Sequence, residues 1–122
     1  KPEITIIGVS AARFECLNAS LYLNKIGIKT NLINLMWLKP FKFTKKQIVS
    51  IKKSKFSLIV ESGYEICGSA RSIAYELNHI TGKKIYALGM KDAIPGAAKY
   101  LENGTPTQAQ IINKIKELLK KI

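Results

Sequence analysis

The chain has 122 residues, of which 47% are hydrophobic and 23% are charged, the composition of one ordinary globular domain. Its net charge of +12 comes almost entirely from lysine, since Arg13 and Arg71 are its two arginines. Nucleic-acid recognition usually relies on arginine, so the charge favours a solvated lysine surface over a nucleic-acid-binding protein. No apolar run approaches the roughly 18 residues of a membrane span, and the start KPEITIIG lacks the features of a signal peptide.

The first predicted strand spans residues 3–10 and leads into a helix over 11–26. Ser10 is placed to cap this helix, and Gly27 is placed to end it. The apolar positions that recur at helical spacing are Phe14, Leu17, Leu21 and Tyr22, with Cys16 and Ala19 alongside.

A second strand is expected over 28–38. Lys39-Pro40 ends it, because a proline nitrogen cannot donate a hydrogen bond to a neighbouring strand. Thr44 is expected to start a short helix that reaches about Ser54. This second strand-helix pair continues the alternation that the first pair begins.

The following elements are expected to be a strand over 56–61, a helix over 68–80, a strand over 83–90 and a loop over 91–104. The last helix is expected to run to Lys120, with Thr105 as its cap and Pro106 in its first turn. Strands that alternate with helices through short connections indicate an α/β fold: a mainly parallel sheet with helices on both faces.

The turn after the third strand has the layout of a phosphate-binding loop, with Gly63 and Gly68 five residues apart before a helix. A P-loop, however, needs a lysine and then a hydroxyl residue after the second glycine. Ser69 and Ala70 occupy those two positions, and Glu61 and Glu65 would repel a phosphate. The sequence therefore favours a tight strand-to-helix turn over a nucleotide site.

Two carboxylates follow predicted strands, at the sheet edge where open α/β folds place their sites. Glu61 ends the third strand, and Asp92 follows the fourth. The favoured role for Glu61 is to cap the turn through backbone N–H groups. No catalytic constellation accompanies either residue.

The cysteines and the histidine do not form a recognisable reactive set. Cys16 and Cys67 lie far apart in apolar settings, which predicts two buried, reduced thiols in a cytoplasmic protein. His79 is the single histidine and cannot alone supply a metal site or a Ser-His-Asp arrangement, so a surface or capping role is expected.

Four phrases in order carry a family resemblance. They are ITIIGVSAARFECLNASLYLNKIGIKTNLINL (4–35), INLMWLKPF (33–41), SLIVESGYEICGSARSIAYEL (57–77) and YALGMKD (86–92). Together they resemble the C-terminal domain of the transketolase family of thiamine-diphosphate enzymes, over essentially the whole chain. The Lys-Pro-Phe phrase departs from the family pattern at Lys42, where an aspartate is usual, and Cys67 stands for the first glycine of a Gly-Gly pair.

The resemblance implies a three-layer α/β/α sandwich on a mixed sheet of five strands, one of them antiparallel. The sequence pattern yields four strands, so the fifth is expected to be short or to lie within 91–104. The resemblance also implies one domain over 1–122, excised from a longer chain or belonging to a split enzyme. Thiamine diphosphate and a divalent metal ion would bind in upstream domains, and this domain would support a homodimer. No catalytic, cofactor-binding or metal-binding residue is expected here, so the isolated domain should be inactive.

The resemblance leaves the family member open between a transketolase, a deoxyxylulose-phosphate synthase and the beta subunit of a 2-oxo acid dehydrogenase component. The phrase LGMKD (88–92) favours a transketolase or a deoxyxylulose-phosphate synthase. Candidate turn or interface residues are Glu61, Gly63, Gly68, Ser69, Lys39, Pro40 and Asp92.

Three hypotheses follow for the chain itself. As an assembly domain it would expose an apolar surface, for which Trp37, Met36 and Tyr64 are candidates. As a free-standing regulatory module it would bind a small anion or nucleotide at the strand ends, near Gly63, Gly68 and Ser69. The third hypothesis, nucleic-acid binding by the lysines, requires an affinity that falls steeply with salt.

Overall fold

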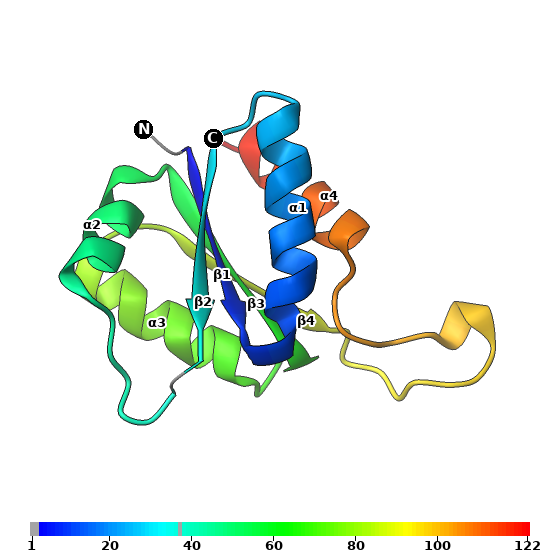
Figure 1. Cartoon of the computed structure of the whole chain (residues 1–122). Coiled ribbons are helices and arrows are strands. Elements are labelled where there is room, and N and C mark those ends of the chain that lie inside the picture. The colour runs from blue at the N-terminus through cyan, green and yellow to red at the C-terminus, as the bar shows by residue number, and fades with distance from the viewer. Residues whose placement is uncertain (1–2, 37) are drawn as a thin grey trace.

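A four-stranded parallel sheet forms the centre of the computed structural model, which describes residues 3–36 and 38–122, Leu101 by its backbone alone. The strands are β1 (Ile4–Val9), β2 (Thr30–Leu35), β3 (Phe56–Tyr64) and β4 (Ile85–Met90). Their order across the sheet is β2-β1-β3-β4, and each neighbouring pair is parallel (Figure 1). The chain therefore winds outward from β1 in both directions, as in doubly wound α/β folds.

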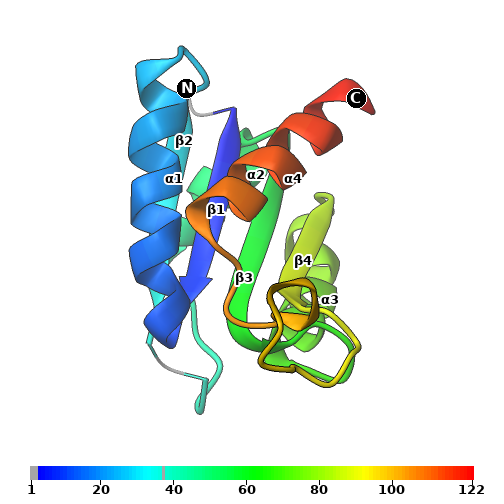
Figure 2. The same ribbon diagram turned by 90° about the vertical axis from the view of Figure 1, so that its right-hand side faces the viewer.

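Helices cover both faces of this sheet and complete three layers. They are α1 (Arg13–Lys25), α2 (Lys45–Lys53), α3 (Ser69–Thr81) and α4 (Gln108–Lys120). One apolar cluster joins the sheet to α1 and α4, and a second joins the opposite face to α2 and α3. Figure 2 shows α4 crossing in front of the strands and α3 behind them. The predicted three-layer α/β/α sandwich is confirmed, and within the described range no helix has the length and apolar character needed to cross a bilayer.

The mixed five-stranded sheet was a wrong expectation for the residues that the structure describes, which form four parallel strands. The segment 91–104 contains a 3-10 turn, η2 (Lys99–Leu101), and projects as an arm from the body (Figure 1). Asn103 holds the two ends of this arm together, because the Nδ2 of Asn103 donates to the carbonyl oxygens of Lys91 at 2.8 Å and Ala93 at 2.7 Å. The arm's own hydrogen bonds thus close a loop and build no strand.

The structure confirms one of the three predicted helix caps and corrects the other two. Thr44 caps α2 in a capping box with Gln47, as predicted. The cap of α4 is Thr107 and not Thr105, because Gln110 three residues later completes a second capping box. Ser10 makes no side-chain cap; its φ of 52° instead begins a 3-10 turn, η1 (Ser10–Ala12), ahead of α1.

The apolar residues that recur at helical spacing on α1 face outward. Phe14, Leu17 and Leu21 are 60%, 45% and 61% exposed. The buried side of α1 consists of Cys16, Ala19, Ser20 and Leu23. Small side chains let the helix lie close to the sheet, and apolar residues on both sides of a helix leave its buried face undetermined by periodicity alone.

One buried hydroxyl in β3 predicts a stabilising substitution. Ser57 Oγ is fully buried and has no hydrogen-bond partner among the described residues. We expect Ser57→Ala to raise the free energy of unfolding by about 1 kcal/mol. The hydroxyl of Ser57 bonds to water in the unfolded chain and loses that partner on folding, and alanine avoids this cost. Urea denaturation measures this change.

Ser54→Ala is the matched control, with the opposite expected sign. Ser54 is also buried, but its Oγ bonds to Thr5 Oγ1 at 2.7 Å and donates to the Ser50 carbonyl at 3.0 Å. Its loss should lower the free energy of unfolding by about 1 kcal/mol. A destabilising Ser57→Ala would show that a water satisfies that hydroxyl.

Candidate functional site at the carboxyl ends of the strands

The turn from β3 to α3 is organised around Glu61, which is 6% exposed. Its carboxylate accepts hydrogen bonds from the Ser69 backbone N–H at 3.1 Å, the Ala70 backbone N–H at 3.1 Å and the Ser69 Oγ at 2.8 Å. A negative charge at a helix N-terminus also interacts favourably with the helix dipole. The predicted capping role of Glu61 is therefore confirmed.

The two glycines of the turn have different roles. A Cβ on Gly68, the N-cap of α3, would overlap the Tyr64 carbonyl oxygen and the Glu61 carboxylate. A Cβ on Gly63 would lie 3.6 Å from Glu61 Oε2, which is an ordinary contact. Cys67, with a φ of 61°, brings the chain back towards the helix. Close approach of the backbone to Glu61 thus requires glycine at position 68 alone.

A hollow of about 580 Å³ lies beside this turn, at the carboxyl ends of β3 and β4. Four predicted residues line it, namely Glu61, Gly63, Gly68 and Asp92. Tyr64 bridges to the arm, because its hydroxyl donates to the Ala93 carbonyl at 3.3 Å. The structure therefore brings the ends of two adjacent strands together, as the strand order requires.

The remaining predicted residues lie apart from this hollow. Lys39 lines a second groove of about 420 Å³, between the segment after β2 and α3, whose other side includes Ser69 and Glu76. Pro40 follows Lys39 across a cis peptide and is exposed. Ser69 contributes to this groove while its hydroxyl stays bound to Glu61.

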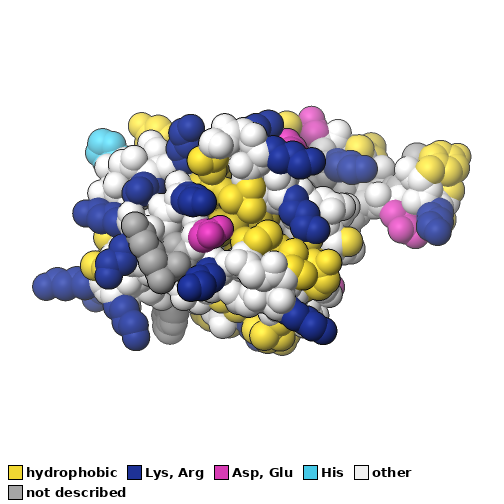
Figure 3. All heavy atoms as spheres, turned by 90° about the horizontal axis from the view of Figure 1, so that it is seen from above, with side chains coloured by type: hydrophobic (Ala, Val, Ile, Leu, Met, Phe, Trp, Pro, Cys, Tyr) yellow, Lys and Arg dark blue, Asp and Glu magenta, His cyan; other side chains and the backbone are white. Residues whose placement is uncertain are grey.

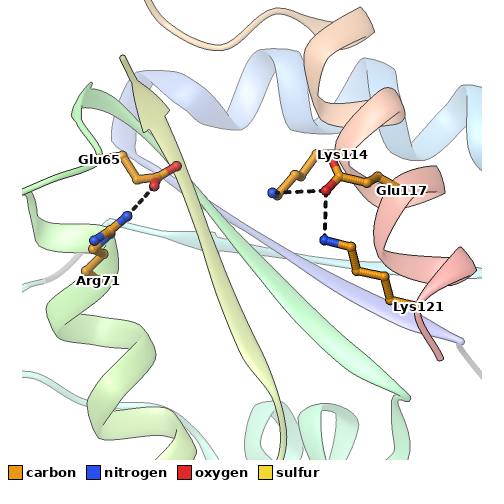
Figure 4. Close-up of polar contacts among 5 residues, drawn as sticks. All are labelled: Glu65, Arg71, Lys114, Glu117 and Lys121. Atoms are coloured by element: carbon orange, nitrogen blue, oxygen red, sulfur yellow. Dashed lines mark hydrogen bonds and ion pairs between the residues drawn. The ribbon is translucent and has the colours of Figure 1, made fainter. Parts of the chain in front are cut away.

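The residues of the turn do not fit a diphosphate. At α3 the first N–H groups already bind Glu61, and at α4 the N–H of Gln108 donates to Glu15 Oε2 at 2.8 Å. Arg71 turns towards Glu65 at 2.6 Å (Figure 4), so its guanidinium is engaged. No group of three or more His, Cys, Asp or Glu side chains able to hold a metal ion occurs among the described residues.

Glu15 is the residue at this end of the molecule that the sequence did not reveal. It lies 93 positions before Gln108, so no local motif signals the contact.

A cluster of charged residues on α4, visible in Figure 4, joins Glu117 to Lys114 and Lys121. The hydrogen bond from Lys121, with the nearby charge of Lys114, lowers the pKa of Glu117.

The two cysteines differ in exposure, which corrects the expectation that both are buried. Cys16 is buried in the core, whereas Cys67 is exposed at the hollow. Burial, with a contribution from Glu15, raises the pKa of the Cys16 thiol from 9.0 to about 12. The two thiols should therefore react at very different rates.

We expect one thiol per native chain to react with DTNB at pH 8, and the second to react only after unfolding. Cys67→Ser should abolish the native reaction, whereas Cys16→Ala should leave it unchanged. Fast modification of Cys16 in the Cys67→Ser variant would contradict the burial of Cys16.

Cys16 should also make the stability of the chain depend on pH. Because its thiol ionises above pH 9 in the unfolded chain, and only near pH 12 in the folded chain, the free energy of unfolding should fall between pH 9 and about 12.

Comparison with known proteins agrees with this architecture. Residues 1–111 match the family model described as transketolase, C-terminal domain. The chain is 28% identical over 124 residues to the mitochondrial pyruvate dehydrogenase E1 component subunit beta of Ascaris suum, covering 96% of this chain and 34% of that protein. A solved structure titled "Split gene transketolase, inactive beta4 tetramer" superposes with a TM-score of 0.77 at 18% identity, covering 98% of this chain and 39% of that one. The chain thus spans about a third of these proteins, and it belongs to the transketolase C-terminal domain family.

Proposed function

We propose that this chain is an assembly domain of a thiamine-diphosphate-dependent enzyme of the transketolase type, one that forms a homodimer and acts in the cytoplasm. The cofactor, the metal ion and the catalytic residues belong to upstream domains or to another subunit. The observation that carries the proposal is the apolar stripe on the outer side of α1, defined by Phe14, Leu17 and Leu21.

The stripe is continuous along the helix. Phe14, Leu17 and Leu21 are three and four positions apart, so their side chains are neighbours on one face. At its start, Arg13 stacks over the Phe14 ring at 4.3 Å and its Nη1 approaches Met36 Sδ at 3.6 Å. Met36 is itself 58% exposed, so the apolar surface extends from α1 to the end of β2.

Such a surface favours contact with another protein. A contiguous exposed apolar patch usually marks an interaction site, because leaving it in water costs free energy. Met36 and Tyr64, two of the residues expected on an interface, are exposed; Trp37 lies outside the described residues. The related solved structure is titled as a tetramer of β subunits, which supports assembly as a role for this kind of domain.

The alternative of a free-standing anion-binding module has less support. Its suggested site was the turn at Gly63, Gly68 and Ser69, where Glu61 occupies the first two N–H donors of α3. An incoming phosphate would have to displace a buried carboxylate that accepts three hydrogen bonds. The turn therefore stabilises the fold without offering an open anion site.

Sedimentation velocity tests the assembly proposal on the 122-residue chain. At about 0.15 M salt, where repulsion between highly charged chains is screened, we expect self-association that increases with concentration. Leu17→Gln combined with Leu21→Gln should give monomers, because the association loses its central apolar contacts. Both side chains are exposed, so the free energy of unfolding should change by less than about 1 kcal/mol.

The matched control replaces two exposed apolar residues of α3, Tyr75→Gln with Ile80→Gln, which are 72% and 49% exposed. This variant should associate like the unmodified chain. The proposal fails if the unmodified chain is monomeric at every concentration. It also fails if the α1 and α3 variants lose association equally.

A further inference from the structure

The acidic residues are absent from a long part of the chain that remains rich in lysine. Residues 16–60 contain no Asp or Glu. The lysines in this range are Lys25, Lys29, Lys39, Lys42, Lys45, Lys46, Lys52, Lys53 and Lys55. Most of them lie in and around α2, so this helix forms the centre of a basic surface. In Figure 3, dark blue side chains gather at the end of the molecule where α2 lies, and the acidic side chains lie nearer the centre and on the arm.

The outer face of α2 has an apolar side chain at its centre. Val49 is 47% exposed, whereas Ile51 is buried and Ile48 packs against the core. The helix neighbours of Val49 at positions −4, −3, +3 and +4 are Lys45, Lys46, Lys52 and Lys53. All four lysines are exposed, so Val49 is ringed by positive charge.

Nothing in the described part of α2 neutralises this charge. The first turn of the helix holds Lys45 and Lys46 and no acidic residue, although the positive end of the helix dipole disfavours cations there. The ion pairs of the described residues involve Lys55, Arg71, Lys114 and Lys121, none of them in α2. A partner that brings carboxylates to this face would therefore relieve an unfavourable arrangement.

We propose that the outer face of α2 docks an acidic polypeptide segment of a partner protein. An apolar side chain of that segment lies over Val49, and its carboxylates pair with the lysines around it. An apolar centre with a charged rim is the usual arrangement of a protein–protein contact. The proposal does not depend on the α1 stripe, which belongs to another helix on the other face of the sheet.

Other occupants fit this face less well. A nucleic acid would be expected to find arginine and exposed aromatic rings, but α2 has neither. The nearby Phe41 and Phe43 are half-buried and pack against each other at 5.4 Å between ring centroids. A second copy of the chain would bring its own net charge of +12, so charge complementarity favours an acidic protein.

Fluorescence anisotropy can test the proposal with a labelled synthetic peptide of about 15 residues, in which leucines recur at three- and four-residue helical spacing and glutamates fill the remaining positions. At about 0.15 M salt the 122-residue chain should bind it. Lys45→Glu with Lys52→Glu should weaken binding about tenfold or more, because two attractions become repulsions. Val49→Ser should weaken binding about threefold or more, and replacing the peptide's leucines by serine should have a similar effect.

The control variant carries the same charge change on α4, which covers the opposite face of the sheet, as Lys116→Glu with Lys120→Glu, and should bind within about twofold of the unmodified chain. Circular dichroism verifies that every variant is folded. Failure to bind the peptide, equal weakening by the control variant, or indifference to Val49→Ser would overturn the proposal. Tighter binding of oligouridine RNA or phosphatidylserine vesicles through Lys45 and Lys52 would assign the face to nucleic acid or to lipid instead.

Discussion

Glu61→Ala is expected to lower the free energy of unfolding by about 3 kcal/mol. The substitution removes three hydrogen bonds to a carboxylate that is 6% exposed, and it leaves the N–H groups of Ser69 and Ala70 without an acceptor. It also removes a negative charge from the N-terminus of α3, where the helix dipole favours it. Urea denaturation should show a lower midpoint with an unchanged slope.

Two further variants distinguish the loss of the helix cap from the loss of an acidic side chain as such. Glu61→Gln keeps the shape but turns an amide nitrogen towards at least one N–H donor, so we expect a loss of about 2 kcal/mol. Glu76→Ala removes an exposed carboxylate from the same helix and should change stability by less than about 0.5 kcal/mol. A similar cost for Glu61→Ala and Glu76→Ala would rule out the capping role.

The same carboxylate bears on the function of the domain. A helix N-terminus after a parallel strand is where many α/β proteins bind phosphate groups. In this chain Glu61 fills that position at α3, and Glu15 does so at α4. Two of the eight acidic residues thus accept hydrogen bonds from helix N-termini and complete the fold.

Local patterns predicted the fold class because each element carries its own signal. The apolar run at β3, the Thr44 cap of α2 and the turn at Gly68 each rest on residues close in sequence. The capping role of Glu61 was also within reach, since it lies only eight positions before Ser69. Alternating strands and helices then require a mainly parallel sheet.

The features that the sequence did not predict depend on packing between distant segments. The contact of Glu15 with Gln108 spans 93 positions, and no short motif encodes it. Periodicity alone does not identify the buried face of α1, because large apolar residues lie on its outer side and small ones on its inner side. Spacing identifies a helix with an apolar stripe, but contact with β1, β3 and α4 decides which side enters the core.

The outward-facing apolar side chains of α1 are informative about function. Phe14, Leu17 and Leu21 would be poorly placed in a monomer, since they stay 60%, 45% and 61% exposed. Their exposure, together with a separate basic face on α2, gives the domain two surfaces of different chemistry. An apolar stripe suits a permanent contact, whereas a lysine-ringed surface suits one that responds to salt.

Gly68→Ala should be the most damaging of these substitutions, with a loss of about 3 kcal/mol or more, because the added methyl group has no space. Its Cβ would overlap the Tyr64 carbonyl oxygen and the Glu61 carboxylate, both of which are fixed by the turn. Relief requires either the backbone of the turn or the Glu61 cap to move. The free energy of unfolding, measured in urea, gives the cost directly.

Two other glycines test whether this cost is steric. At Gly63 an added Cβ would lie 3.6 Å from Glu61 Oε2, and at Gly104 it would meet nothing within 4 Å. Gly63→Ala and Gly104→Ala should therefore stay within about 1 kcal/mol of the unmodified chain. If Gly63→Ala were as costly as Gly68→Ala, the flexibility of the whole turn, and not the space beside Glu61, would be what glycine supplies. If the overlap with Glu61 dominates, the losses from Gly68→Ala and Glu61→Ala should combine to much less than their sum, because both disrupt the same cap.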